Sequence, residues 1–417
     1  MAVSLNGTHH HALVHGYSHH HGEPIAPLWS GTMNSENRLY YADNLEILRL
    51  LCEDVSIAGN VRLVYIDPPY STGGFFQTRD FQSAYSDHLR GDEYLDFMKH
   101  RLALLYDLLA SDGSCFIHLD STMVFHVKVL MDTIFGASNF KGMITRQKCK
   151  PKNYTRTTFG NISDYILFYG KSPTSIWHRS YYEWTDEKMY KEYPYIDEKT
   201  GKRHKRVPVH APGTRNGKTG EEWRGMMPPQ GKHWQYTPDK LEEMDKRGEI
   251  YWSSNGNPRR KVFFEDSKGI PVQDIWSDCI DIENQNTIST GYPTEKNPLI
   301  LQRIIEACSN KGDIVLDCFA GSGTTLEVAS NLERRWIGVD VSETAITTIL
   351  KRFGHGTKPL GDFTAKKVEE NTSLFEATDN HIAINKQHRI VRDFTLFSQP
   401  SYLPVFQTLL HQLDQHE

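Results

Sequence analysis

Asp67, Pro68, Pro69 and Tyr70 are the residues with the clearest chemical potential in this 417-residue sequence. They directly follow the apolar run 61–66, so a carboxylate, a rigid turn and an aromatic ring stand at the exit of a predicted buried strand. The Asp67 carboxylate can accept one hydrogen of an amine, and the Pro68 carbonyl, held extended by Pro69, can accept the other. Such acceptors localise the nitrogen lone pair and stabilise the positive charge that grows during alkylation. With Tyr70 to stack on a flipped base, the pattern favours methylation of the exocyclic amine of a nucleobase.

The same four residues also suit a turn that merely ends a strand, because Asp and Pro are common turn residues. Pro makes up about 5% of ordinary sequences, and Asp and Tyr are of similar order, so chance would give this run in such a chain with a probability of roughly 10⁻³. The catalytic interpretation is therefore preferred.

A second motif lies far downstream, where residues 313–325 predict a strand, a glycine turn and the start of a helix. Gly321 and Gly323 permit tight turning, and a second strand over 335–339 ends at Asp340. The segment thus predicts a βαβ unit with an acid that can bind ribose hydroxyls. Taken alone, it is also compatible with a crossover that binds nothing.

Two phosphate-binding interpretations fail at single positions of this motif. A dinucleotide fingerprint requires a third glycine where Leu326 stands, and a phosphate loop requires a lysine after Gly323, where Thr324 stands. A nucleoside cofactor without phosphates fits, and S-adenosylmethionine is such a molecule.

The motif order resembles the beta group of amino-methylating DNA methyltransferases, a permuted group in which the catalytic motif precedes the cofactor motif. The resemblance covers roughly residues 38–352 and is carried by residues 41–45, 67–70, 112–119, 163–169, 291–298 and 313–325. It implies an α/β fold, a doubly wound Rossmann-like methyltransferase sheet with an inserted target-recognition region.

By this resemblance the cofactor is S-adenosylmethionine. Asp43 or Asn44 would contact its adenine and Asp340 its ribose, while Thr294, Lys296 and the turn from Phe319 to Gly323 would hold its methionine end. The implied cofactor-binding set is Asp43, Asn44, Thr294, Lys296, Asp317, Phe319, Gly321, Gly323, Thr324 and Asp340. The implied catalytic set is Asp67, Pro68, Pro69 and Tyr70.

Periodic segments predict the elements that position these motifs. Apolar residues spaced by three and four, Leu95, Met98, Leu102, Leu105 and Leu109, predict a helix that begins near residue 91 and ends before residue 113. A strand is expected over 115–119 and a helix over 298–307. Alternating strands and helices indicate a doubly wound sheet, whose ligands lie beyond the carboxyl ends of its strands. One pocket can therefore serve both Asp67 and Asp317.

The predicted organisation has four parts. Residues 1–30 form a His-rich tail, 31–170 with 291–360 the methyltransferase domain, 171–290 the target-recognition insertion, and 361–417 a C-terminal extension. The histidines favour a disordered tail or tag over a metal site, because no carboxylate or cysteine supports coordination. The extension is left open between packing on the core, joining a homodimer and fraying.

Composition favours an intracellular enzyme. The chain is 38% hydrophobic and 24% charged, as is usual for globular proteins, and its six cysteines are too scattered for a disulfide framework or a zinc site. It has no apolar run of about 18 residues and no signal peptide pattern, so a cytoplasmic location without membrane spans is expected. No metal is predicted.

The net charge of −5 conceals a basic middle region. Residues 141–262 hold 25 Lys and Arg against 14 Asp and Glu, a balance of +11, which leaves −16 for the remainder. Basic clusters with interleaved aromatics, including Trp223 and Trp234, favour contacts with DNA phosphates, although any one cluster is equally a solvated loop surface. The predicted DNA-binding residues are Lys148, Lys150, Lys152, Arg156, Arg259, Arg260 and Lys261.

The sequence therefore predicts an S-adenosylmethionine-dependent methyltransferase that acts on adenine N6 of a flipped base in double-stranded DNA. Asp at position 67 favours adenine by resemblance, since the permuted cytosine-N4 enzymes usually carry Ser there. Cytosine N4 and RNA adenine remain alternative substrates. A binding protein without turnover and a nicotinamide-dependent oxidoreductase are rivals from other classes, disfavoured by Asp67 and by Leu326. Any restriction endonuclease partner would be a separate chain.

Overall fold

The chain divides into two compact units in a computed structural model. The described residues are 23–32, 35–69, 75–77, 83–86, 91–151, 157–281, 288–290, 292, 295–355, 358–359 and 390–414. One unit, here called the sheet unit, comprises the described parts of Met1–Ser180 and Gln273–Glu417, and the other, the inserted unit, is Tyr181–Val272. The inserted unit is shorter at both ends than the predicted insertion 171–290, because the chain on either side returns to the strands of the sheet unit.

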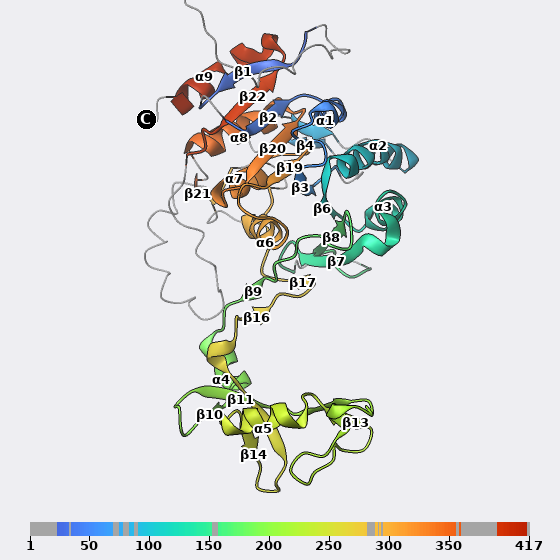
Figure 1. The fold of residues 1–417 in the computed structure, drawn as a ribbon. Helices are drawn as coiled ribbons and strands as arrows, with labels where there is room; N and C mark the ends of the chain where they lie inside the picture. Colours follow the sequence, from blue (N-terminus) through green and yellow to red (C-terminus); the bar gives the residue numbers. More distant parts are fainter. Residues whose placement is uncertain are drawn as a thin grey trace, which may run out of the picture. The chain divides into compact units, whose positions relative to one another are not determined.

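A ten-stranded sheet forms the centre of the sheet unit as far as it is described (Figure 1). Its spatial order is β1 (Ala26–Ser30), β22 (Phe394–Ser398), β2 (Asn37–Tyr41), β20 (Arg335–Asp340), β19 (Ile314–Asp317), β3 (Val61–Ile66), β6 (Leu109–Leu119), β8 (Ser163–Gly170), β7 (Phe140–Gln147) and β17 (Ile275–Trp276). The strands from β22 to β6 are parallel, and β8 runs antiparallel to both of its neighbours. Five of the six residues of β3 and all four residues of β19 are buried, which suits strands that are covered on both faces.

Helices cover both faces of this sheet (Figure 1). One layer contains α1 (Asn44–Glu53), α2 (Asp92–Leu108) and α3 (Val124–Met131), and the other contains α6 (Pro298–Cys308), α7 (Thr324–Asn331) and α8 (Glu343–His355). The predicted helix is α2, in which Met98, Leu102 and Leu105 are fully buried in the main core. The sheet with two helical layers confirms the predicted doubly wound α/β fold.

The described ends of the chain complete one edge of the sheet. β1 lies within the segment expected to be a tail, and it pairs antiparallel with β22, which pairs parallel with β2. The helix α9 (Leu403–Asp414) follows β22 and buries Phe406, Leu410 and Leu413 against the sheet unit. Of the three roles left open for the C-terminal segment, its described part therefore packs on the core, because apolar residues recur there at helical spacing. The residues 1–22 and 360–389 lie outside the described residues.

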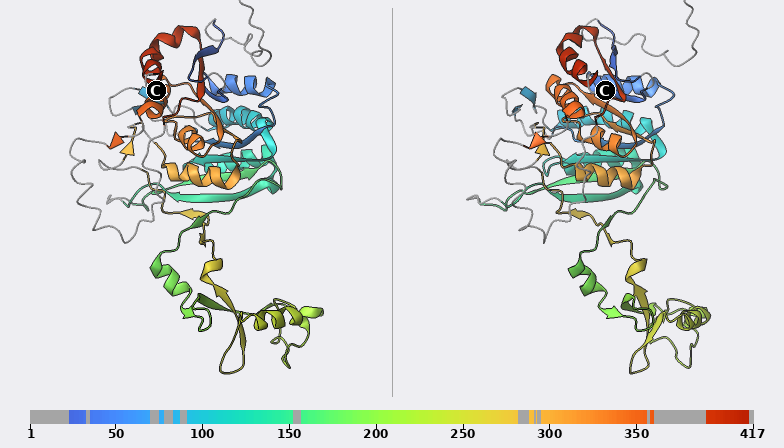
Figure 2. Two further views of the ribbon diagram at one scale, coloured as in Figure 1. Left: turned by 60° about the vertical axis from the view of Figure 1, so that its left-hand side comes forward. Right: turned by 90° about the vertical axis from the view of Figure 1, so that its left-hand side faces the viewer.

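The inserted unit has a small antiparallel sheet of its own (Figure 2). Its strands are β10 (Tyr195–Ile196), β11 (Arg203–Pro208), β15 (Pro258–Phe263) and β14 (Ile250–Trp252), accompanied by α4 (Asp186–Glu192), α5 (Pro238–Lys246), the pair β12 (His210–Pro212) with β13 (Lys232–Trp234), and the pair β9 (Tyr181–Tyr182) with β16 (Ile270–Pro271). Trp223 and Trp234 are 3% and 2% exposed and form its core with Leu241 and Met244. These two aromatics of the basic region therefore serve the core of the unit rather than its surface.

Minor elements complete the description. They are the pair β4 (Phe75–Gln77) with β5 (Ser83–Ser86), the pair β18 (Ile288–Ser289) with β21 (Lys358–Pro359), a π-helical turn at Asp132–Gly136, and 3₁₀ turns at Ala137–Asn139, Lys218–Gly220, Phe264–Asp266 and Pro400–Tyr402. All six cysteines are free thiols. Among the residues that the structure describes, no helix has the length and apolar character needed to cross a membrane.

Candidate active site

The two sequence motifs meet where the connections of the parallel strands diverge. From β19 the chain crosses to β20 on one side, and from β3 it crosses to β6 on the other, so the neighbouring strands β19 and β3 flank a topological switch point. Asp317 ends β19, Asp340 ends β20, and Asp67 directly follows β3. Because these strands are parallel, the three carboxylates lie at one edge of the sheet, the edge expected for Asp67 and Asp317.

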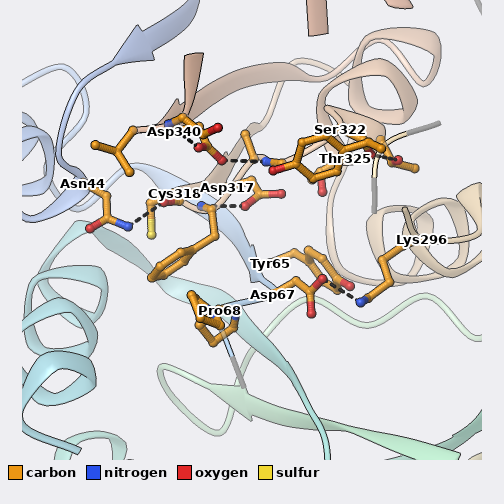
Figure 3. A pocket seen from close by; sticks show the side chains of 18 of the residues that line it. Asn44, Tyr65, Asp67, Pro68, Lys296, Asp317, Cys318, Ser322, Thr325 and Asp340 are labelled. Carbon is orange, nitrogen blue, oxygen red and sulfur yellow. Dashed lines mark hydrogen bonds and ion pairs between the residues drawn. The ribbon is translucent and has the colours of Figure 1, made fainter. Parts of the chain in front are cut away.

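A cavity of about 400 Å³ opens at this edge (Figure 3). The predicted site residues that line it are Asp43, Asn44, Asp67, Pro68, Pro69, Lys296, Asp317, Phe319, Gly321, Thr324 and Asp340. Such a volume is suited to a ligand of cofactor size. Tyr70 and Thr294 lie outside the described residues, so their predicted roles remain predictions.

Asp67 and Lys296 form an ion pair across the cavity, with 2.7 Å between Nζ and Oδ2 (Figure 3). Their side chains are 20% and 9% exposed, so the contact is largely sheltered from water. The resemblance assigns Lys296 to the methionine end of a cofactor, whereas the structure joins it to the predicted catalytic carboxylate. Two charges at this distance hold each other in place, and Asp67 thereby has a defined orientation.

A buried ion-pair network positions the segment that carries Lys296. Arg352 of α8 is fully buried, and it pairs with Glu295 and with Glu327, the latter at 2.7 Å. Glu295 also accepts hydrogen bonds from the backbone and the hydroxyl of Thr290 at 2.8 and 2.7 Å. The position of Lys296 thus depends on an arginine that the sequence motifs did not single out.

The glycine turn between β19 and α7 is shaped by positive backbone angles. Gly321 has φ +52° and Gly323 has φ +77°, a region that other residues rarely adopt. A Cβ on Gly323 would also stand 2.8 Å from the Ile349 side chain. Gly321 donates its backbone N–H to Oδ2 of Asp340 at 2.8 Å, which ties the turn to the end of β20. Gly323 shapes the turn without lining the cavity.

Asp317 and Asp340 are carboxylates inside the protein. Burial raises the pKa of Asp317 to about 7, although Thr325 and the backbone of Phe319 donate hydrogen bonds to it. Burial also raises the pKa of Asp340, whose carboxylate accepts hydrogen bonds from the backbone of Ser342 and Gly321. Both shifts arise because a carboxylate loses hydration inside the protein, and a cation in the cavity would offset that loss.

Arg101 of α2 lines the cavity beside the residues predicted to contact a cofactor adenine. Its Nε donates to Oδ1 of Asn44 at 2.6 Å, and its guanidinium lies 3.5 Å from the centre of the Phe97 ring. The Asn44 amide in turn donates to the Cys318 carbonyl, so both ends of that side chain are already engaged by protein groups. Asp43 caps α1 by accepting from the backbone of Leu45. Sequence reasoning missed Arg101, although a charged residue beside the apolar positions Met98 and Leu102 was a usable signal.

The predicted basic surface separates into residues with different neighbours. In the sheet unit, Lys148 is half-buried and Lys150 is exposed, while Lys152 and Arg156 lie outside the described residues. In the inserted unit, Arg259 is exposed, whereas Arg260 donates to the Tyr236 hydroxyl at 2.8 Å and Lys261 pairs with Asp197 at 2.6 Å. Successive side chains of β15 point to opposite faces, so the run does not form one cluster.

Comparison with known proteins decides the family. The model of a DNA methylase family, covering N6 and N4 enzymes, matches residues 61–351. This chain belongs to that family. The DNA methylase is 44% identical over 365 residues to the type II methyltransferase M.EcaI of Enterobacter cloacae, a match that covers 87% of this chain and 78% of the relative. It is 28% identical to the type III restriction-modification enzyme StyLTI Mod subunit of Salmonella typhimurium, with coverage of 78% and 55%.

Two solved structures also resemble the DNA methylase. The M1.HpyAVI–SAM complex matches with a TM-score of 0.41 and 16% identity, covering 76% of this chain and 98% of that one. The cytosine-N4-specific PvuII DNA methyltransferase matches with a TM-score of 0.41 and 15% identity, covering 82% and 93%. The methylase has its catalytic motif before its glycine motif, which is the order expected for the permuted group.

Proposed function

We propose that this DNA methylase transfers the methyl group of S-adenosylmethionine to N6 of an adenine flipped out of duplex DNA. The observation that supports the proposal most directly is the shared cavity, in which Asp67 faces the edge that carries the glycine turn and Asp340. One wall thus offers acceptors for an amine, and the other offers a turn and an acid suited to a nucleoside. Asp rather than Ser at position 67 supports adenine over cytosine.

The charge of the cavity suits a cationic cofactor. Its lining contains the carboxylates of Asp43, Asp67, Asp317 and Asp340 against the cations of Arg101 and Lys296. When bound, S-adenosylmethionine supplies an activated methyl group attached to a positively charged sulfur. Asp340 would hold the ribose hydroxyls through its carboxylate oxygens, which line the cavity and are held in place by backbone hydrogen bonds from Gly321 and Ser342.

The DNA methylase then has to prepare the amine. Asp67, held by Lys296, accepts one amine hydrogen, and the Pro68 carbonyl accepts the other, so the nitrogen lone pair is directed into the cavity. Both acceptors gain strength as positive charge develops on the nitrogen, which lowers the barrier rather than merely binding the base. The side chains of Asp67 and Lys296 are only 20% and 9% exposed, so much of the water that would weaken these contacts is excluded.

We further propose that the methylase is the modification enzyme of a restriction-modification system, with double-stranded DNA as its partner and any endonuclease on a separate chain. The names of the type II and type III relatives support this setting. Arg259 and Lys150 are the predicted phosphate contacts that the structure leaves exposed.

Nucleoside analysis tests the function. Unmethylated DNA and RNA are incubated with the protein and labelled S-adenosylmethionine, and digests are assayed for N6-methyladenine and N4-methylcytosine. We expect N6-methyladenine in DNA only. Label in N4-methylcytosine or in RNA would assign the alternative substrate, and absence of label from every nucleoside would refute the proposed activity.

A further inference from the structure

A chain of polar side chains runs from the cavity into the sheet. Tyr65 of β3 lines the cavity, and its hydroxyl lies 2.8 Å from Nδ1 of His118 on β6. Nε2 of His118 lies 3.0 Å from Oδ2 of Asp164 on β8. The strands β3, β6 and β8 are consecutive in the sheet, so the chain crosses it directly from strand to strand.

These three side chains are not explained by packing alone. Tyr65, His118 and Asp164 are 2%, 0% and 3% exposed, and their strands are otherwise mostly apolar at the same depth. Polar groups at such depth are costly unless each has a partner, and apolar residues would fill the space at lower cost. Their arrangement as a linked series therefore points to a role in the chemistry of the cavity.

Arg146 of β7 closes the inner end of the series. It is fully buried, with Nη1 3.3 Å from Oδ2 of Asp164, and it also pairs with Asp281. Burial opposes ionisation of Asp164, yet His118 and Arg146 outweigh it and hold the pKa of that carboxyl below its usual value. Asp164 is thus an anion that favours a hydrogen on Nε2 of His118, which leaves Nδ1 to accept from the Tyr65 hydroxyl.

Tyr65, the member of the series that lines the cavity, lies on the same side as Asp67, the proposed acceptor for the amine. Tyr65 and Asp67 are two residues apart, at the end of one strand, so their side chains project from the same face of the sheet, and Figure 3 shows them on one side of the cavity. Asp67 already pairs with Lys296. Uptake of a proton by Asp67 would break that pair, so the reaction needs another acceptor nearby.

We propose that Tyr65, His118 and Asp164 form a relay that accepts the proton released by methyl transfer, an inference that rests on the proposed function. N6 forms a bond to the methyl carbon, the carbon–sulfur bond breaks, and its electron pair stays on sulfur. The nitrogen then carries one proton too many. That proton passes to the Tyr65 oxygen as the tyrosine proton passes to Nδ1 of His118, and Asp164 stabilises the imidazolium. The proton returns to water by the same route when the cavity empties.

Other charged groups act on the relay from each side. From the cavity, Asp67 and Asp317 act on Tyr65, and together with burial they raise its pKa. Lys296, which also lines the cavity, acts on Asp164, while from the far end Arg146 acts on Asp164 directly and Asp281 acts through Arg146. Tyr65 therefore keeps its proton between turnovers and conducts protons rather than serving as a free base.

The first test needs neither cofactor nor DNA. Nitrogen-15 NMR of histidine-labelled protein, with the His118 signals assigned by their loss in His118→Gln, gives the tautomer and the protonation midpoint of His118. We expect a hydrogen on Nε2 in the neutral ring, and a midpoint that shifts in Tyr65→Phe. A hydrogen on Nδ1 would overturn the relay, because that nitrogen could not then accept from Tyr65.

The second test is single-turnover methyl transfer as a function of pH. Tyr65→Phe should slow transfer at least tenfold, with cofactor and DNA affinity within twofold of wild type. The wild-type rate should depend on pH and should fall in D₂O, and both dependences should disappear in the variant. Tyr169→Phe is the matched control, because that buried tyrosine donates to Asp132 at 2.7 Å outside the cavity.

The outcomes separate the relay from the proposed function. A Tyr65→Phe enzyme with the wild-type rate and pH profile would overturn the relay while leaving methylation intact. Equal losses in Tyr65→Phe and Tyr169→Phe would assign the tyrosine a structural role. A wild-type protein that methylates nothing would remove both proposals.

Discussion

Lys296 and Asp67 come from segments that are far apart in the sequence, yet Nζ of the lysine lies 2.7 Å from Oδ2 of the aspartate. Lys296 stands just before α6, and Asp67 follows β3. The pair therefore fixes the predicted catalytic carboxylate from the side of the chain that also carries the glycine motif.

Asp67→Asn should reduce methyl transfer by at least about two orders of magnitude, the usual loss when one group that stabilises transition-state charge is removed. Cofactor binding should persist, because the glycine turn and Asp340 are untouched. Rapid-quench assays and calorimetric titration measure the two quantities. Asp54→Asn is a matched control, since Asp54 is 19% exposed and pairs with Arg38 at 2.8 Å, away from the cavity. Similar losses in both variants would contradict a catalytic role.

Lys296→Met should slow transfer by about tenfold or more, because a charge-assisted contact of about 1.5–3 kcal/mol no longer orients Asp67. In the Asp67→Asn background the same change should have little further effect, and this non-additivity can be measured with a double-mutant cycle. Lys128→Met serves as control, because it removes the cation from another ion pair, with Asp132 at 2.7 Å. Additive losses would mean that Lys296 acts on something other than Asp67.

Affinity for S-adenosylmethionine should rise with pH and level off above about pH 7. Burial raises the pKa of Asp317 from 3.8 to about 7, so below that pH the carboxyl is mostly protonated, and a cationic ligand must displace the proton. Calorimetry between pH 5.5 and 8.5 should show this slope in wild type and its loss in Asp317→Asn. A slope that persists in the variant would assign the proton to another group.

The same shift predicts how Asp317 affects the stability of the ligand-free protein. Its pKa is higher in the folded state than in the unfolded chain, so the folded state binds the proton more tightly. The stabilisation from this group is full below about pH 4 and is lost as pH rises to about 7, after which it stays constant. Urea unfolding of wild type and Asp317→Asn across this window measures the difference, which should grow with pH. A difference that does not change with pH would contradict the assignment.

Arg352→Met should lower the free energy of unfolding by about 3–5 kcal/mol, because it removes the buried cation that lies between Glu295 and Glu327. Lys311→Met is the control, since the Lys311–Glu333 pair is more than 60% exposed on both sides and should contribute at most about 1 kcal/mol. Thermal and urea unfolding followed by circular dichroism compare the two variants. Equal effects would show that the Arg352 network is not a structural support.

Arg259→Ala should weaken DNA binding and reduce its salt dependence by about one unit of log–log slope, as expected when one phosphate contact is lost. Arg260→Ala and Lys261→Ala should change that slope less, because those side chains are engaged with Tyr236 and Asp197. Fluorescence anisotropy titrations at several salt concentrations compare the three variants. An unchanged slope for Arg259→Ala would place the DNA-binding surface elsewhere.

The sequence by itself determined the fold class and the carboxylates at the strand exits that line the site. Mostly apolar runs predicted β3, β19 and β20, and helical spacing predicted α2. The residues at the strand exits, Asp67, Asp317 and Asp340, were recognisable because ligands bind at carboxyl ends in such sheets. These elements and exit residues could be predicted because hydrophobic periodicity and turn-forming residues are properties of neighbouring positions in the sequence.

Only the tertiary structure decided which side chains meet. It paired Lys296 with Asp67, engaged Asn44 with Arg101, buried Trp223 and Trp234, turned Arg260 to the opposite face of β15 from Arg259, and aligned Tyr65, His118 and Asp164 across three strands. Each of these depends on strand order or on which face of an element a residue occupies. Contacts between residues distant in sequence follow from packing of the whole chain, which no local pattern encodes.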